Sequence, residues 1–383
     1  MEEKTKITYK HRGFKYRIYP TEDQCISFTK TFGCVRFVYN NLLDKQQKAH
    51  NAGEKLAGKI GLDNHCTRVL KKEYPWLCEV DKFALSNSAF ALATAYSNFF
   101  NRSLKAEKPK FKSRKTSRMS YSTNITNNNI AIVDTQIKLP KLGMVKAKLH
   151  RPLPRGAIIK GATVSKTACG HYYCVLKLAI PATPVPATKP TIERTLGIDY
   201  SSHDFAVFSD GSYATPPHAL RMMEARLAKE QRRLSRKTRG SSNKEKQRRK
   251  VAAVHEKVAN QRKDFCHKLS REIANSYDAV CVEDLDLRNL SRTLRLGKAT
   301  ADNGFGMFRT FLGYKLEDKG KLLIKINKWF PSSKLCHCCG YINNELMLKD
   351  RTWTCAGCGT KHDRDVNAAI NIRNEGFAIQ KAM

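Results

Sequence analysis

Apolar and basic positions alternate near the start of the chain, and this alternation then gives way to helical spacing. Residues Phe14–Tyr19 alternate apolar or aromatic side chains with Lys15 and Arg17, which predicts a strand with a basic polar face. After a proline, Thr21 and Gln24 form the signature of a capping box. The apolar side chains that follow recur every three or four residues and predict a helix with one buried face.

A second helical pattern and a series of short β-rich segments come next. Residues 82–100 carry a regular apolar stripe, and residues 105–118 are rich in Lys and Arg. The period then becomes that of strands, in four segments at 130–133, 144–149, 158–164 and 172–180. We expect a small barrel or a twisted sheet, which the first strand could close. The helical segment would then be an insertion, and the proline-rich residues 181–191 would form a linker.

The second half of the chain combines a predicted strand pair with a long helical hairpin. Residues 196–199 and 204–208 favour strands, and apolar stripes then predict two helices that meet at residues 240–243. Residues 221–263 hold sixteen Lys or Arg against four Glu. Charge runs are usually solvated surface, but an imbalance of this kind favours a surface that follows phosphates.

The composition indicates a polyanionic partner. The 383-residue chain has 70 Lys and Arg against 34 Asp and Glu, which leaves a net charge of +36. Such an excess attracts nucleic acid and makes the binding strongly salt-dependent. The basic candidates for these contacts are Lys15, Arg17, Lys110, Lys112, Arg232, Arg233, Arg248 and Arg249.

A membrane surface is the weaker alternative partner. The sequence has no apolar run of 18 residues, and its first residues lack the apolar stretch of a signal peptide. We therefore expect no membrane partner and a cytoplasmic location. Most of the thirteen cysteines are scattered singly outside a C-terminal cluster, which fits a reducing compartment with one metal site better than a disulfide framework.

The C-terminal cysteine cluster has the spacing of a zinc ribbon. Two C-x2-C pairs are separated by fifteen residues, and a glycine follows each pair. This arrangement lets four thiolates converge on one tetrahedral Zn²⁺. His337 and Cys338 lie inside the first pair and could each replace a ligand, but only Cys336 with Cys339 leaves the two-residue gap. The predicted ligands are Cys336, Cys339, Cys355 and Cys358.

Three acidic residues stand at the ends of predicted elements. Asp199 closes one apolar strand, Glu283 closes a second, and Asp365 opens a helix. Carboxylates from two adjacent strands and a helix can hold two Mg²⁺ ions about 4 Å apart, as in an RNase H-like nuclease core. Asp284 and Asp363 are competing candidates. Strand parity does not separate Glu283 from Asp284, because both faces of that strand are apolar.

At these residues the chain resembles the TnpB family, transposon-encoded RNA-guided DNA nucleases that are related to type V CRISPR effectors. The resemblance spans nearly the whole chain, and Asp365 matches the catalytic aspartate of the family's last motif. The matching segments are Tyr16–Thr21, Pro109–Lys112, Gly197-Ile-Asp199, Val282-Glu283-Asp-Leu285, Phe308–Lys315, Pro331–Cys336 and Asp363-Arg-Asp365-Val-Asn-Ala-Ala.

The resemblance implies an α+β multidomain protein. An N-terminal β-barrel (wedge) with an inserted helical recognition domain would precede an RNase H-like RuvC α/β domain with an inserted zinc ribbon. The expected ranges are 1–20 and 113–182 for the wedge, 21–112 for the helical domain, 183–195 for the linker, 196–330 and 361–383 for the nuclease domain, and 331–360 for the ribbon.

The resemblance also implies the function. The protein would act as a monomer with a guide RNA from the transposon end, recognise a short motif beside the target, and cut double-stranded DNA with two catalytic Mg²⁺ ions and one structural Zn²⁺. Catalysis would fall to Asp199, Glu283 and Asp365. The alternatives are a nuclease-inactive RNA-guided repressor, an unguided transposase or junction resolvase, and, more remotely, a zinc-ribbon transcription factor.

Overall fold

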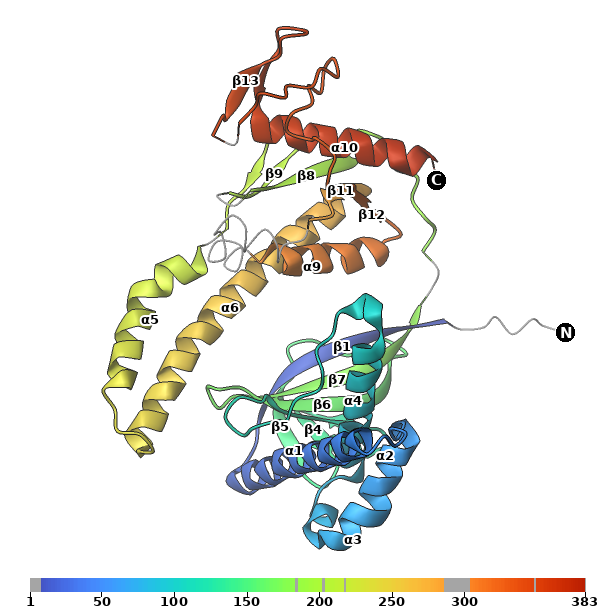
Figure 1. Ribbon diagram of the computed structural model, residues 1–383, viewed down its shortest axis with the longest axis vertical. Helices are drawn as coiled ribbons and strands as arrows, with labels where there is room; N and C mark the ends of the chain where they lie inside the picture. The colour runs from blue at the N-terminus through green and yellow to red at the C-terminus, as the bar shows by residue number, and fades with distance from the viewer. Residues whose placement is uncertain are drawn as a thin grey trace, which may run out of the picture. The chain divides into compact units, whose positions relative to one another are not determined.

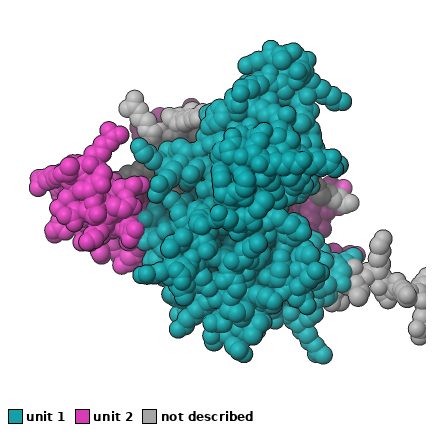
Figure 2. Space-filling model, turned by 90° about the horizontal axis from the view of Figure 1, so that it is seen from below, with its two compact units in different colours: residues 1–183 teal, residues 184–383 magenta. Residues whose placement is uncertain are grey.

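The computed structural model describes residues 8–182, 185–201, 204–216, 218–285, 304–347 and 349–382. The chain divides into two compact units, residues 1–183 and 184–383, which are coloured separately in Figure 2. Each unit has a sheet and a core of its own. Within the described ranges, no helix is long and apolar enough to cross a membrane.

The first unit is built on an antiparallel sheet of seven strands in the order β2-β6-β7-β1-β5-β4-β3 (Figure 1). The alternation seen in the sequence is confirmed, because Tyr16 and Ile18 are buried in the core while Lys15 is exposed on the other face. The strands are β1 (Thr8–Tyr19), β2 (Met119–Asn124), β3 (Ala131–Val133), β4 (Gln136–Leu139), β5 (Gly143–Lys148), β6 (Ile158–Lys166) and β7 (Tyr172–Ala182).

This sheet is open. The sequence left a small barrel and a twisted sheet as alternatives, and the structure has the open sheet and not the closed barrel that the wedge assignment named. In the described part of the chain, β2 and β3 are edge strands that pair with one neighbour each. Strand β3 has only three residues, and helix α4 covers the free edge of β2, where the Asn87 side chain donates to the Ser122 carbonyl at 3.0 Å. A covered edge needs no further strand.

Helices fill the chain between β1 and β2, as the sequence predicts. The capping box is present, with the Gln24 amide donating to Thr21 Oγ1 at 3.3 Å. Gln24 Nε2 also donates to the Met144 carbonyl at 2.8 Å, which ties the helix to β5. The helices are α1 (Glu22–Asn51), α2 (Lys59–His65), α3 (Lys71–Glu73) and α4 (Lys82–Phe100), with a π turn at Cys66–Leu70 and 3₁₀ turns at Pro75–Glu79 and Arg102–Leu104.

The second unit contains a five-stranded mixed sheet in the order β10-β9-β8-β11-β12. Strands β8, β9 and β10 are antiparallel, and β11 runs parallel to both β8 and β12. The strands are β8 (Thr195–Ser201), β9 (Phe205–Phe208), β10 (Tyr213–Ala214), β11 (Ala279–Glu283) and β12 (Leu322–Ile326). The strand pair predicted from the sequence is therefore confirmed as β8 and β9.

Helices lie on both faces of this sheet. Figure 1 shows α10 along one face and the helices α6 and α9 on the other. The predicted helical hairpin is present as α5 and α6, with the Ser241 hydroxyl capping α6 through the Lys244 amide at 3.1 Å. The helices are α5 (Ala219–Ser235), α6 (Ser242–Ser276), α9 (Phe305–Glu317) and α10 (Arg364–Ala382).

Helix α10 packs closely on two central strands, β8 and β11. A Cβ on Gly197 of β8 would overlap the Ala369 carbonyl, and a Cβ on Gly376 of α10 would overlap the sulfur of Cys281 in β11. Only glycine permits so close an approach of helix and strand. Gly197 and Cys281 therefore mark the face of each strand that meets α10.

A glycine-to-alanine pair tests this packing. Gly197→Ala should lower the free energy of unfolding by about 1–3 kcal/mol or more, because the added methyl group has to push α10 away from β8. Gly33→Ala, inside α1 where no atom lies within 4 Å of the added Cβ, should instead be neutral or stabilise by about 0.5–1 kcal/mol. Urea unfolding measures both changes, and equal stabilities for the two variants would contradict the close contact.

Candidate active site and metal centre

Strand parity brings two of the predicted acids to the same face of the sheet. Side chains two apart on a strand point to one side, so Asp199 shares the α10 side with Gly197, and Glu283 shares it with Cys281. Strands β8 and β11 are neighbours in the sheet. The two carboxylates therefore project from adjacent strands toward the start of one helix.

Asp365 approaches the same place from the first turn of α10. The neighbouring Asp363 has a different role, because its Oδ1 accepts from the amides of Asp365 at 3.0 Å and Val366 at 2.9 Å. These bonds satisfy helix-terminal N–H groups. Asp363 is thus a helix cap, and the Asp365 side chain remains available to the acidic cluster.

The charges of Glu283 and Asp365 act on Asp199. Burial raises the pKa of Asp199 well above its usual range, and the charges of Glu283 and Asp365 raise it further, while Arg364 opposes them. Burial also raises the pKa of Glu283, although a hydrogen bond from Ser332 Oγ to Glu283 Oε1 at 2.7 Å partly offsets this. Grouped carboxylates with raised pKa values are a common feature of functional sites.

Asp284, the competitor of Glu283, lies in a different environment. Its Oδ1 is 3.2 Å from Lys325 Nζ and 3.4 Å from Arg309 Nη1, and its side chain is 54% exposed. The two neighbouring acids therefore differ in surroundings. Asp284 is paired with cations at the surface, whereas Glu283 belongs to the partly buried acidic group.

The donor set of the acidic cluster suits hard cations. Three carboxylates supply oxygen ligands of the kind that Mg²⁺ prefers, and a bound cation would relieve their mutual repulsion. Among the described residues, only a cysteine cluster brings all its ligand atoms within 4.8 Å of one another. Arg351 Nη1 lies 3.0 Å from Asp365 Oδ2 and balances part of the charge.

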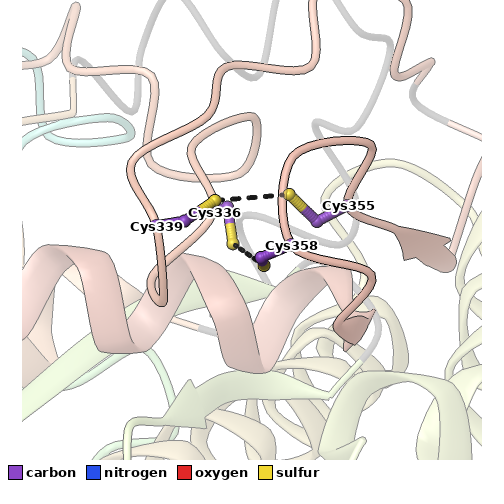
Figure 3. Close-up of side chains that lie close together, drawn as sticks. All are labelled: Cys336, Cys339, Cys355 and Cys358. Carbon is purple, nitrogen blue, oxygen red and sulfur yellow. Dashed lines mark hydrogen bonds between the residues drawn. The ribbon is translucent and has the colours of Figure 1, made fainter.

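The four predicted zinc ligands come together at the end of two loops (Figure 3). The Sγ atoms of Cys336 and Cys358 are 3.7 Å apart, and those of Cys339 and Cys355 are 3.5 Å apart. Zn–S bonds of about 2.3 Å in a tetrahedron require sulfurs roughly 3.8 Å apart. The cluster therefore has the size and the donor chemistry for one Zn²⁺.

Both knuckles of the cluster are built in the same way. The amide of Gly340 donates to the Cys336 carbonyl at 3.0 Å, and the amide of Gly359 donates to the Cys355 carbonyl at 2.9 Å. Both glycines have positive φ, at +78° and +73°, which is the conformation that favours glycine. The side chain and backbone of Thr360 hydrogen-bond the Cys358 sulfur and lower its pKa to about 6, which favours the metal-binding thiolate.

Two buried asparagines of α10 hold the cysteine loops against the helix. Asn367 Nδ2 donates to the Leu335 carbonyl at 2.8 Å, and Asn371 Nδ2 donates to the Ser332 carbonyl at 2.8 Å. The ring of His337 also contacts Asn367, with Nδ1 at 2.9 Å from Oδ1. Asn367 belongs to the motif quoted above without a role assigned to it, and Asn371 was not predicted. Their spacing of four residues on an otherwise apolar helix face was the available signal.

The basic candidates occupy varied positions. Lys15 Nζ lies 3.8 Å from the Tyr173 ring centroid, and Arg17 lies beside Tyr19. Lys112 Nζ lies 3.5 Å from the Tyr39 ring centroid, and burial lowers its pKa. The other candidates are exposed, and some of them form ion pairs with glutamates. They are Lys110, Arg232, Arg233, Arg248 and Arg249.

Two cysteine variants test which cysteine of the first knuckle binds zinc. Cys339→Ser should release the zinc and lower the thermal stability of the ribbon, because structural zinc supplies folding energy directly. Cys338→Ser, one position earlier and outside the cluster, should keep about one Zn²⁺ per chain. Metal analysis of the purified proteins measures this, and zinc retained by Cys339→Ser but lost from Cys338→Ser would reverse the assignment.

Profiles of three protein families match the chain. A family described as "Probable transposase" matches residues 179–294, "Cas12f1-like, TNB domain" matches residues 305–372, and "Helix-turn-helix domain" matches residues 10–55. The last description does not fit the fold of that segment, which consists mainly of strand β1 and the single 30-residue helix α1.

Similar proteins and structures extend these matches. A Streptomyces pristinaespiralis protein, provisionally named an RNA-guided DNA endonuclease, is 39% identical over 369 residues, which cover 96% of this chain and 90% of that protein. A TnpB-like protein of Acanthamoeba polyphaga mimivirus is 30% identical over 146 residues, or 36% of this chain and 27% of that protein. The structure of Cas12f1 with sgRNA and target DNA has a TM-score of 0.59 at 14% identity, over 96% of this chain and 99% of that one.

The structural likeness shows a Cas12-like α+β fold of several domains, as the sequence predicts at this level. The 39% identical relative is matched along nearly its whole length. Together with the transposase-family profile over residues 179–294, this match establishes that the chain belongs to the TnpB family.

Proposed function

We propose that this protein is an RNA-guided endonuclease that cleaves double-stranded DNA at a single acidic site. The observation that carries the proposal is the placement of Asp199 and Glu283 on neighbouring strands, on the face where α10 packs, with Asp365 in the first turn of that helix. The effect of the Glu283 and Asp365 charges on the pKa of Asp199 agrees with this placement. The strand order of the second unit, with three antiparallel strands followed by two parallel additions, agrees with an RNase H-like core.

Asp199, Glu283 and Asp365 are the proposed catalytic residues and would hold two Mg²⁺ ions. When bound, such ions supply an activated water and stabilise the leaving oxygen of a phosphodiester. The residues of this chain do the positioning. Ser332 orients Glu283 by its hydrogen bond, Asp363 caps the helix that carries Asp365, and Gly197 lets that helix reach Asp199.

The proposal that an RNA guides the protein rests on its net charge and on its relatives. The 39% identical relative carries the name of an RNA-guided DNA endonuclease, and a net charge of +36 fits an RNA and a DNA partner bound together. In such a complex the protein reads shape and a short flanking motif, and base pairing reads the rest. We assign the first unit to a wedge with an inserted recognition domain, and the second to a RuvC domain with a zinc ribbon.

Reconstitution with the native RNA tests whether an RNA guides the cleavage. RNA that copurifies with the full chain would be sequenced and supplied with DNA targets that match its variable end. Cleavage confined to matching targets would support the proposal. Cleavage with unchanged sequence choice after the RNA is digested would favour an unguided transposase, and tight guided binding without any cutting would favour a repressor.

A pair of acid variants tests the chemistry. Asp199→Asn should reduce target cleavage at least about 100-fold, because several kcal/mol of charge stabilisation depend on the bound metal. RNA and DNA binding should be nearly unchanged. Asp284→Asn, at the neighbouring surface acid, should keep most of the activity. Cleavage assays and gel-shift titrations measure both properties, and a comparable loss of binding in Asp199→Asn would count against a catalytic role.

The raised pKa of Asp199 leads to a separate prediction about stability. The folded state holds the Asp199 proton more tightly than the unfolded state, so this carboxyl favours folding at low pH, and that contribution is lost as the pH rises through its ordinary value toward the raised one. At neutral pH, Asp199→Asn should therefore raise the Tm of the zinc-loaded, magnesium-free protein, because it removes one of the repelling charges.

Magnesium should reverse the order of the two Tm values, so that the wild type becomes more stable than Asp199→Asn. Mg²⁺ should raise the Tm of the wild type and have little effect on Asp199→Asn, and the rise should be larger at about pH 8 than at about pH 5, where protons compete for the carboxylates. Calorimetry with and without Mg²⁺ measures these shifts. The same Mg²⁺ response in both proteins would exclude Asp199 as a ligand.

A further inference from the structure

Trp329 is an exposed aromatic side chain close to the proposed active site. It follows β12 by three residues and is 80% exposed, the highest value among the large apolar side chains of the described residues. By contrast, Trp353 is 7% exposed and lies inside the ribbon core. The exposed indole offers a large apolar face to a ligand.

The loop that carries Trp329 is held in place by its own hydrogen bonds. Asn327 Oδ1 accepts from the Trp329 amide at 3.0 Å, and the Asn327 carbonyl accepts from the Phe330 amide at 3.1 Å. The Ser332 amide then donates to the Phe330 carbonyl at 2.8 Å. These bonds fix the backbone on both sides of the indole, so little entropy would be lost when a ligand stacks on it.

The same loop is bonded to the acidic cluster. Ser332, three residues after Trp329, donates directly to the Glu283 carboxylate at 2.7 Å. Glu283 also lies opposite Ile326 in the β11–β12 ladder. Three residues of chain span at most about 10 Å and paired strands lie about 5 Å apart, so Trp329 is within roughly 15 Å of Glu283, a distance of only a few nucleotides.

Cationic side chains accompany the indole. Lys328 Nζ lies 4.9 Å from the Trp329 ring centroid. A cleft of about 640 Å³ opens beside this loop at the ends of β11 and β12, and it is lined by Asp284, Leu285, Lys325, Ile326, Asn327 and Lys328. An exposed ring with adjacent lysines combines a surface for base stacking with charges that can contact the phosphate backbone.

We propose that Trp329, with Lys328, is a stacking platform for single-stranded DNA that leads a strand into the acidic site. The inference rests on the proposed function for its choice of DNA, since a strand about to be cut has to pass the carboxylates of Asp199, Glu283 and Asp365. A base stacked on Trp329 would set the strand's register a few nucleotides from the cutting point. Trp329 is thus a positioning residue for the cleavage reaction.

Intrinsic fluorescence tests the platform without any cleavage. The chain has three tryptophans, at positions 76, 329 and 353. The full-length, zinc-loaded protein would be titrated without added Mg²⁺ with single-stranded oligothymidylate, whose bases should quench Trp329 on stacking. Trp329→Phe should lose most of the quenching and keep most of the affinity, whereas Trp329→Ala should bind about tenfold more weakly. Trp76→Phe, in the first unit, should behave like the wild type.

The outcomes separate the platform from the nuclease. Quenching that survives in Trp329→Phe, or that disappears in Trp76→Phe, would overturn the platform. Tighter binding and stronger quenching by oligouridylate would overturn its assignment to DNA. Guided cleavage by the wild type is assayed separately, so a failure of the proposed function shows as absent cutting while the fluorescence result stands on its own. If the wild type cuts, Trp329→Ala should cut more slowly, and Trp329→Phe should restore most of the rate.

Discussion

The close contact between helix α10 and strands β8 and β11 is the constraint on which the candidate active site depends. Gly197 removes the side chain that would keep the helix off β8, and Gly376 does the same on the helix side against Cys281. Because one contact involves the helix backbone at Gly197 and the other the buried Cys281 side chain at Gly376, the position of the helix leaves little tolerance. The first turn of α10, with Asp365, is held beside the strands that carry the other two acids.

The zinc centre depends on the same helix. Asn367 and Asn371 bind carbonyls of the segment that leads into the first cysteine pair, and Ser332 of that segment binds Glu283. The ribbon is therefore linked to the acidic cluster through hydrogen bonds to buried side chains. Under the proposed function, zinc acts on catalysis indirectly, by holding this segment in place.

The second unit places a cluster of acids in a chain that is otherwise strongly basic. A strongly basic chain attracts polyanions, but the acids at the proposed cutting point repel phosphate and one another. Burial of Asp199 beside Glu283 and Asp365 is unfavourable for the empty protein. Such destabilised clusters are typical of functional sites, where a ligand relieves a strain that the surrounding fold maintains.

Much of the fold could be predicted from local patterns, and the errors arose where one element depends on another. The capping box, the β1 alternation and the cysteine spacing are local and were correct. Local patterns left a barrel and an open twisted sheet as alternatives, because the choice depends on α4 covering the edge of β2. Parity alone did not separate Glu283 from Asp284, since this requires knowing which face of β11 meets α10. Likewise, Lys112 gave no sequence signal that its ammonium lies against Tyr39.

The pairing of β1 with β7 has a consequence for biosynthesis. The Thr8 hydroxyl donates to the Ala182 carbonyl across 174 positions of the sequence, so the first strand leaves the ribosome long before its partner exists. Such long-range pairing slows folding, and unpaired strands are prone to aggregation. Helices α1, α2 and α4 share a local core of their own. They can form during this interval and give the waiting strand a folded neighbour before the sheet is completed.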